Sequence, residues 1–468
     1  MSSFLFTHRS ATLRHPPGPR GHWLWGTMRE FRQDSLGTLL HWTREYGDAI
    51  RFRFFLHYYG YLFSHPDDVQ HILQDNNRNY TKIPAPGNVL LQPLVGSGLL
   101  TSDGDSWLRQ RRLMQPAFHR RRIASFATTM TDAARETLAR WQAPAASGEP
   151  MDVAEEMTRL TLEIAGKTLF SMDLTREAEV VGDAFTAAST EILAYMAIPF
   201  GAYLVNLPWW PGARRLRRHV AILDEVVEGI IDERRQQRHA GRRTSDDLLD
   251  MLMDARDEET GEGMSDEQLR DEVMTLMLAG HETTSLALSW TLYLLSQHPD
   301  VRRRLEAEVD EVLGGRTPTM ADIPDLTYTT MVLEESMRLY PPAYATSRWC
   351  VEADEVGGYD VPAGSVVTLS PYVTHRHLDF WEEAERFDPE RFQPERKAER
   401  PRFAYMPFGG GPRQCIGNRF AMMEATLILA LVAQRYRLQL VPGHPVEMEP
   451  LITLRPRYGL CMTVLERE

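Results

Sequence analysis

The sequence predicts a mainly α-helical fold with small β-sheets, of the α+β class, and three observations lead to this prediction. Helical periodicity of the apolar residues dominates from Asp105 to about Leu313. A proline-free stretch of roughly thirty residues begins near Ser265 and is long enough for one helix to cross most of a domain. Short segments rich in aromatic and β-branched residues follow the N-terminal prolines and Pro342, where they indicate small sheets.

Composition and charge exclude several classes of protein. The chain has 468 residues, of which 43% are apolar and 25% charged, as is ordinary for a soluble globular protein and not for a disordered one. A net charge of −13 gives the whole chain no electrostatic attraction to nucleic acid or to an anionic membrane. Cys350, Cys415 and Cys461 lie in unrelated contexts, which fits a reducing compartment better than a disulfide framework.

The first elements along the chain are an extended segment and a β-hairpin. Fifteen residues precede Pro16, and they include His8, Arg9 and Arg14, so neither a membrane span nor a signal-peptide core can be built from them. We therefore expect a cytoplasmic protein without a membrane anchor. Residues 50–55 and 58–63 have the composition of two short strands around a turn.

The helical part has recognisable ends and breaks. It is expected to be interrupted near residues 199–211 and by the polar run 234–247. The long helix has Ser265 as its candidate N-cap and ends at about Gln297, before a His-Pro pair. A further helix over residues 327–340 is stopped by the two prolines that follow it.

One face of the long helix carries Ala279, Gly280 and Thr283. Glycine inside a helix costs about 1 kcal/mol relative to alanine, and a hydrogen bond from Thr283 to the carbonyl of Ala279 would loosen the helix further. Two interpretations stay open, a packed helix that crosses a neighbour closely at Gly280 and a helix with a functional groove. A zinc-protease motif starting at His281 is excluded, because position 285 holds a serine.

The glycine-rich loop over residues 408–417 contains Cys415 and leads into an amphipathic helical stretch. A sulfur near a helix N-terminus feels the positive end of the backbone dipole, which lowers the thiol pKa and suits a thiolate that binds a metal. Residues 409–411 are glycines that can adopt positive φ angles, and Gly417 lets a flat ligand approach the backbone. Arg413 could pair with an anionic edge of that ligand.

Five positions of this loop, Phe408, Gly411, Arg413, Cys415 and Gly417, resemble the heme-ligand signature of the cytochrome P-450 family of heme-thiolate monooxygenases. The resemblance implies one domain over residues 1–468, with residues 1–20 as an extended N-terminal segment, in the P-450 fold with its long central helix over the heme. It implies heme b (iron protoporphyrin IX) as the cofactor and O2 as the co-substrate. Thiolate ligation by the cysteine raises electron density at the iron and favours O–O cleavage.

The resemblance also assigns roles to residues outside the loop. The sequence from Ala279 to Thr284 is similar to the acid-alcohol segment of the family, in which Gly280 helps to form a groove for dioxygen and Glu282 and Thr283 relay protons. The residues implied to bind the heme are Cys415, Trp107, Arg111, Arg348, Arg413, Phe408 and Gly417. Glu335, Arg338 and Arg391 are implied to form a buried structural charge network.

The implied reaction inserts one atom of O2 into a C–H bond, with electrons from NAD(P)H delivered through ferredoxin and ferredoxin reductase, or a flavodoxin. The expected substrate is lipophilic, with a fatty acid favoured and a terpenoid, carotenoid or steroid as alternatives. The candidate substrate residues are Leu276, Ala343, Tyr344, Ala345, Thr346, Ile452, Thr453, His57 and Tyr61. The arginines at positions 109, 112, 120, 121 and 122 have the pattern of a solvated basic face, but they also fall where the resemblance implies that an acidic electron donor would dock.

Two other functions fit the same signature. A heme-thiolate peroxygenase or isomerase would need no electron donor, although the Glu282-Thr283 pair argues against it. A non-catalytic heme-binding sensor would bind a ligand without turnover. Substrate-dependent consumption of NAD(P)H distinguishes the monooxygenase from both.

Overall fold

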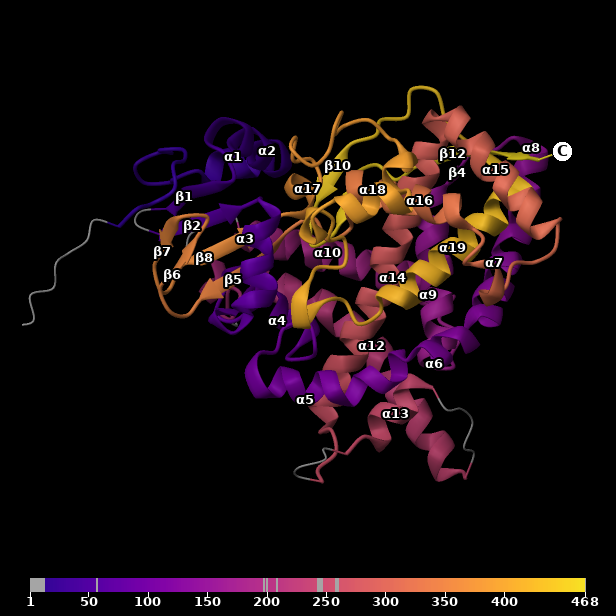
Figure 1. Cartoon of the computed structure of the whole chain (residues 1–468). Coiled ribbons are helices and arrows are strands. Elements are labelled where there is room, and N and C mark those ends of the chain that lie inside the picture. Colours follow the sequence, from indigo (N-terminus) through magenta and orange to yellow (C-terminus); the bar gives the residue numbers. More distant parts are fainter. Residues whose placement is uncertain are drawn as a thin grey trace, which may run out of the picture.

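A computed structural model describes residues 13–55, 58–196, 198, 201–207, 209–241, 247–256 and 261–467. Figure 1 shows a large helical part, with α14 (Asp266–Gln297) running through its middle, and a smaller part at one end that carries the main sheet. The predicted class, mainly α with small sheets, is confirmed. Among the described residues, no helix combines the length and the apolar character needed to cross a membrane.

Among the described residues, thirteen α-helices precede α14 along the chain. They are α1 (Met28–Gln33), α2 (Ser35–Tyr46), α3 (Pro66–Gln70), α4 (Pro86–Val95), α5 (Gly104–Met114), α6 (Arg120–Ser125), α7 (Ala127–Arg140), α8 (Gln142–Ser147), α9 (Val153–Leu169), α10 (Ala178–Met196), α11 (Gly201–Leu204), α12 (Pro211–His239) and α13 (Leu248–Asp254). Of these, α4, α9, α12 and α13 pack against α14. After α14 follow α15 (Pro299–Leu313), α16 (Thr327–Leu339), α17 (Pro371–Thr374), α18 (Pro394–Glu399) and α19 (Asn418–Arg435).

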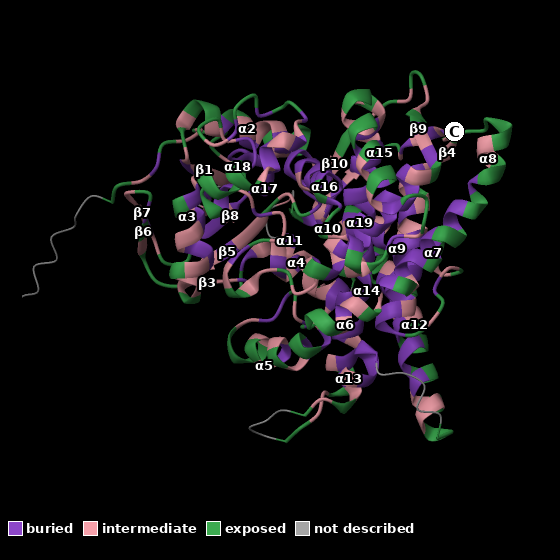
Figure 2. Ribbon diagram, turned by 45° about the vertical axis from the view of Figure 1, so that its right-hand side comes forward, coloured by how far each residue is buried: buried purple, intermediate pink, exposed green. Residues whose placement is uncertain are grey.

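The central helix begins and ends where its sequence predicts. The hydroxyl of Ser265 accepts a hydrogen bond from the backbone N–H of Gln268 at 3.1 Å, which satisfies one of the free donors at the helix start. Pro299 follows directly on the C-cap, His298, and opens the next helix. Figure 2 shows that buried residues concentrate in α14, α9 and α19, so the core surrounds this helix.

The main sheet has the strand order β1-β2-β8-β5-β3. Its strands are β1 (Ala49–Phe55), β2 (Tyr58–Phe63), β8 (Val366–Leu369), β5 (Thr346–Cys350) and β3 (Tyr80–Thr81), and the pair β2–β8 is parallel while the others are antiparallel. Three smaller sheets are formed by β4 (Met151–Asp152), β12 (Cys461–Glu466) and β9 (Tyr436–Leu440), by β10 (Met448–Pro450) and β11 (Leu454–Pro456), and by β6 (Asp354–Val356) and β7 (Tyr359–Val361). The predicted hairpin is therefore confirmed to within one residue.

One predicted break begins later than expected. The polar run 234–247 does separate α12 from α13, but α12 continues through the beginning of the run to His239, and residues 242–246 lie outside the described residues. Arg234 is buried and forms an ion pair with Asp247 at 2.6 Å, and it also donates to the carbonyl of Phe170 at 2.7 Å. A run of charged residues is typical of a solvent-exposed loop. Here Arg234 and Asp247 are buried and neutralise each other's charge, so the helix can continue.

Candidate active site

A cavity of about 2120 Å³ lies beside α14. Its walls come from α4, α10, α14, the start of β5, the loop with Cys415 and the β10–β11 hairpin. Most of its lining side chains are apolar. Ligand pockets usually have volumes of about 300–1,000 Å³, so this cavity can hold more than one small molecule.

The loop over residues 408–417 presents Cys415 to the cavity. The backbone N–H of Cys415 donates to the carbonyl of Phe408 at 2.9 Å, which closes the loop. Gly409 and Gly411 have positive φ angles of 67° and 66°, as predicted, and a side chain at Gly411 would also collide with the carbonyl of Leu73. Gly410 is extended instead, and it is glycine because a Cβ there would lie 2.2 Å from the ring of Phe403.

The pKa of the Cys415 thiol changes in the direction opposite to the predicted one. Cys415 is exposed to the cavity, but the protein atoms packed around its thiol desolvate it and raise its pKa, and this effect outweighs the opposing hydrogen bond from the N–H of Gly417 and the charge of Arg111. The net direction is therefore opposite to the predicted lowering, because desolvation disfavours the thiolate more than the N–H of Gly417, the N-cap of α19, favours it. A thiolate at this position needs a cation beside it, and an iron ion would provide one.

A group of cations lies on one side of the cavity. The buried guanidinium of Arg348 donates to Thr346 Oγ1 at 2.8 Å, and burial together with the charge of Arg413 lowers its pKa to about 10. Arg413 pairs with Asp103, donates to the carbonyl of Ser102 at 2.9 Å and lies over the ring of Trp107 at 4.4 Å. Among the described residues, one terminal nitrogen of Arg413 is buried without a hydrogen-bond partner.

Lys82 is the functional candidate that sequence reasoning missed. Burial and then the charges of Arg348 and Arg413 lower its pKa well below the usual value, and its ammonium group donates to the carbonyl of Leu100. Asp103 accepts hydrogen bonds from the backbone N–H groups of Lys82 and Ile83 at 2.6 and 2.7 Å. No local signal in the sequence distinguishes this lysine, because the arginines beside it come from distant segments.

These observations fit a heme. Two buried basic side chains, Lys82 and Arg348, and the partly buried Arg413 face one carboxylate, and these donors together with the free nitrogen of Arg413 suit the two propionates. Arg111 lies close enough to Cys415 to affect its pKa, and both residues line the cavity. The cysteine sulfur and the cations thus meet at one cavity, as an iron porphyrin requires. Among the described residues, no cluster of three or more His, Cys, Asp or Glu side chains suits a metal ion.

Across the cavity, α14 presents the predicted alcohol. Thr283 Oγ1 donates to the carbonyl of Ala279 at 2.9 Å, as expected, and Thr283, Ala279 and Gly280 all line the cavity. A Cβ on Gly280 would meet only Leu169 among the described residues, at an ordinary contact distance of 3.7 Å. The glycine is therefore not required for a close helix crossing, which leaves the groove as the better interpretation.

The acid next to it has specific partners. Glu282 is buried, and its Oε1 accepts a hydrogen bond from Thr453 Oγ1 at 3.1 Å and forms an ion pair with Arg455 Nε at 3.2 Å. Its neighbour His281 is also buried and bonds through Nδ1 to the carbonyl of Met277 at 2.7 Å, so His281 is committed to the protein interior. Sequence reasoning assigned Glu282 to the proton relay but did not find its partner Arg455.

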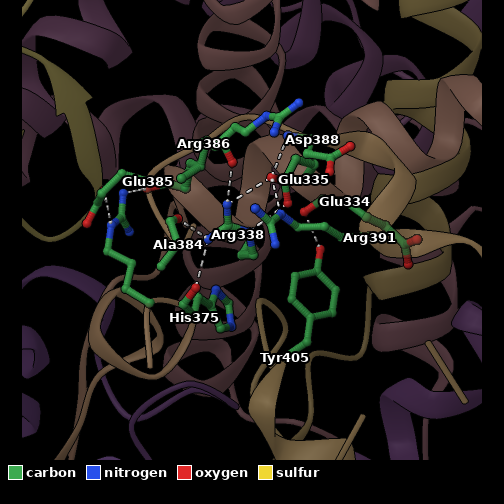
Figure 3. A network of polar contacts seen from close by, with 12 residues as sticks. Glu334, Glu335, Arg338, His375, Ala384, Glu385, Arg386, Asp388, Arg391 and Tyr405 are labelled. Atoms are coloured by element: carbon green, nitrogen blue, oxygen red, sulfur yellow. Dashed lines mark hydrogen bonds and ion pairs between the residues drawn. The ribbon is translucent and has the colours of Figure 1, made fainter. Parts of the chain in front are cut away.

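The three residues of the predicted charge network lie together in the structure, as Figure 3 shows. Arg338 forms two hydrogen bonds with Glu335, at 2.6 and 2.8 Å, and Arg391 lies 3.5 Å from the same carboxylate. Arg338 also donates to the backbone carbonyls at positions 375, 384 and 386. His375 in turn accepts from the N–H of Met406 at 2.8 Å, and this contact connects the network to the loop that carries Cys415.

The predicted substrate residues divide into three groups. Those that line the cavity are Leu276, Ala343, Tyr344, Ala345, Thr346, Ile452 and Thr453. Tyr61 is buried in the sheet core, and its hydroxyl lies 3.3 Å from His15 Nδ1, outside the residues that line the cavity. His57 lies outside the described residues.

Comparisons with known proteins agree with this geometry. The sequence model of the family described as Cytochrome P450 matches residues 16–462. "Cyclooctatin synthase" from Streptomyces melanosporofaciens is 41% identical over 84% of this chain and 84% of its own length, and "Cyclooctat-9-en-7-ol 5-monooxygenase" from the same organism is 37% identical over 82% and 81%. "Pentalenene oxygenase" from Streptomyces avermitilis is 34% identical over 84% and 85%.

The fold, the cysteine loop and these matches define the class of protein as a heme-thiolate enzyme. The chain belongs to the cytochrome P450 family. It is an oxidoreductase of the monooxygenase type, and membership of the family implies that it uses heme and O2.

Proposed function

We propose that the protein hydroxylates a terpenoid at an unactivated C–H bond, with Cys415 as the axial heme ligand. The observation that carries this proposal is one cavity that both Cys415 and Thr283 of α14 line and whose other lining side chains are mostly apolar. Two relatives bear the names of terpenoid substrates, cyclooctat-9-en-7-ol and pentalenene. An apolar enclosure of this size suits a bulky polycyclic hydrocarbon.

A fatty acid, which the sequence favoured, now has less support. A carboxylate substrate needs a polar anchor, and the two residues proposed for it were His57 and Tyr61. The hydroxyl of Tyr61 turns toward His15 instead of the cavity, and His57 lies outside the described residues. Arg215, a cation that does line the cavity, is already paired with Glu191 at 2.6 Å.

The residues described above have distinct roles in this reaction, in heme binding and in proton transfer. Cys415 holds the iron, while Arg348, Arg413 and Lys82 hold the propionates with Trp107 and Arg111 beside them. When bound, a thiolate-ligated heme supplies the reductive activation of O2. Thr283 offers a hydroxyl at the groove and Glu282 a buried carboxylate next to it, so that protons reach the reacting centre through the protein and not through bulk water. The apolar walls exclude water and orient the substrate.

The electron donor is proposed to be an acidic ferredoxin or flavodoxin that receives electrons from NAD(P)H. Arg112, Arg120 and Arg121 are exposed on α5 and α6. The ring of Phe118, just before α6, lies 3.8 Å from where a Cβ on Gly417 would be, so this basic surface adjoins the cysteine side of the cavity. Reversing the charge of Arg120 and Arg121 should raise the KM for a ferredoxin several-fold and leave substrate binding unchanged.

The test of the catalytic assignment is Thr283→Ala. The variant should bind heme normally but release much of the reducing power as hydrogen peroxide, because the alcohol of the relay is lost. Thr291→Ala is the matched control, since Thr291 makes the same kind of bond to the carbonyl of Ala287, at 2.6 Å, on a buried part of the same helix. Full coupling in Thr283→Ala would contradict the assignment.

The substrate class is tested by titration. Cyclic terpene hydrocarbons and their monoalcohols should shift the Soret band at lower concentrations than fatty acids of similar carbon number do. A product that carries oxygen from labelled O2, formed only with NAD(P)H and redox partners, supports the monooxygenase. Equal or better activity with peroxide alone would favour the peroxygenase.

A further inference from the structure

Arg455 connects three elements around the acid of the proposed relay. It lies on β11, its Nε is 3.2 Å from Glu282 Oε1 on α14, and its guanidinium also donates to Thr186 Oγ1 on α10. No pattern in the sequence brings these residues together, since Glu282 and Arg455 are far apart along the chain. The following inference rests on the proposed function of Glu282.

This contact differs from a surface ion pair in its burial. The side chain of Glu282 is 1% exposed, whereas that of Arg455 is 18% exposed. A buried carboxylate is unfavourable unless a cation and hydrogen-bond donors compensate its charge, and here Arg455 is the cation and Thr453 the added donor. Arg455 therefore lies between the buried carboxylate of Glu282 and the protein surface and compensates the charge of that carboxylate.

The hairpin that carries Arg455 is fixed against α14. The indole N–H of Trp290 donates to the carbonyl of Leu454 at 2.9 Å, and the N–H of Leu454 donates to the carbonyl of Pro342 at 2.9 Å. Leu454 stands between Thr453 and Arg455, and alternate residues of an extended chain share one side. This placement directs both side chains to the same carboxylate oxygen.

Other groups near Glu282 cannot replace the cation. His281 Nε2 lies 4.0 Å from Glu282 Oε2, but burial lowers the pKa of His281 and so favours its neutral form. Thr161 on α9 reaches this region only through a hydrogen bond to the carbonyl of His281, and it carries no charge. Among the described residues, Glu282 Oε2 has no hydrogen-bond partner, so this second oxygen is available for proton transfer.

We propose that Arg455 is a positioning residue of the monooxygenase: it holds the carboxylate of Glu282 toward the β10–β11 hairpin, and it couples that position to α10 through Thr186. Because α10 lines the cavity, a displacement of α10 would change the contact between Thr186 and Arg455. The position of Arg455 beside Glu282 would change with it. The relay is thereby sensitive to how the cavity is filled.

The test compares Arg455→Gln and Arg455→Lys with Arg457→Gln. Arg457 is two residues away and pairs with Glu447 and Glu449, so it is a matched control for a lost arginine on this hairpin. Coupling, measured as product formed per NAD(P)H consumed, is followed against pH. In Arg455→Gln, coupling should fall several-fold at neutral pH, and its acid limb should move to higher pH by about one unit or more, because the carboxylate is then protonated more easily. Arg455→Lys should recover most of the loss, and Arg457→Gln should match the wild type.

Infrared difference spectroscopy supplies a readout that does not depend on turnover. Arg455→Gln should show the carbonyl stretch of a protonated carboxyl group at neutral pH, and this band should vanish in the Arg455→Gln, Glu282→Gln double variant. An unchanged pH profile together with no new band would overturn the proposal. If Arg455→Gln fails to fold, Arg455→Lys and Thr186→Val carry the test, with a smaller shift expected in the same direction and no shift in either overturning the proposal. A wild-type protein that forms no product refutes the proposed function instead, and the infrared band still decides the role of Arg455.

Discussion

Glu272→Gln offers the most quantitative test of how the structure sets pH dependence. Glu272 lies on α14, fully buried, where its Oε2 accepts from the backbone N–H of Leu99 at 3.0 Å. Burial raises its pKa to about 7, although the bond from Leu99 opposes this. Among the described residues, its second oxygen has no hydrogen-bond partner. The glutamine retains an oxygen for Leu99 but cannot ionise.

The sign and size of the effect follow from the pKa. A carboxyl group whose pKa is raised in the folded state stabilises the fold at low pH, and this contribution is lost as the pH rises from the unfolded value toward the folded one. A rise in the pKa from the ordinary value of 4.5 to about 7 corresponds to about 3 kcal/mol in total, of which about 2.5 kcal/mol should be lost between about pH 5 and pH 8. Over this pH range, the free energy of unfolding of the wild type should therefore fall by about 2.5 kcal/mol relative to that of Glu272→Gln.

The assay is denaturant unfolding of both heme-loaded proteins at the two pH values. The difference in unfolding free energy between variant and wild type should change by about 2.5 kcal/mol in favour of the variant at about pH 8. Glu267→Gln on the first turn of α14 is the control, because that side chain is exposed and its difference should stay constant. A constant difference for Glu272→Gln as well would refute the reasoning, since it would mean that burial does not disfavour the carboxylate.

Three further variants test the remaining assignments. Cys415→Ser should abolish the red-shifted Soret band that carbon monoxide gives with thiolate-ligated ferrous heme; retention of that band would identify another ligand. Arg338→Met should lower the unfolding free energy by roughly 3–5 kcal/mol, measured by denaturant titration, because it leaves the Glu335 carboxylate buried without its main partner. Lys82→Met should lose heme to an acceptor protein several-fold faster than the wild type does, because one donor to the propionates is removed. An unchanged transfer rate would mean that Lys82 does not bind the propionates.

Sequence reasoning succeeded wherever the signal is local. The start of α14 follows from a serine cap and its end from a proline, and the bond from Thr283 to Ala279 spans one helical turn. The charge network was also predicted, since two of its members lie three residues apart on α16 and the family signature supplied Arg391. The thiol pKa was mispredicted because desolvation depends on the whole surroundings and not on the nearest helix.

The sequence by itself determined the class of fold, the heme-thiolate chemistry and the residues that lie within a turn or a loop of one another. Capping, helical periodicity and glycine-dependent loop geometry act over a few residues, and the sequence displays them directly. Only the tertiary structure decided that Lys82 joins Arg348 and Arg413, and that Arg455 holds Glu282. These contacts join segments that are distant along the chain, and the energies of buried charges depend on which partners the fold brings to them.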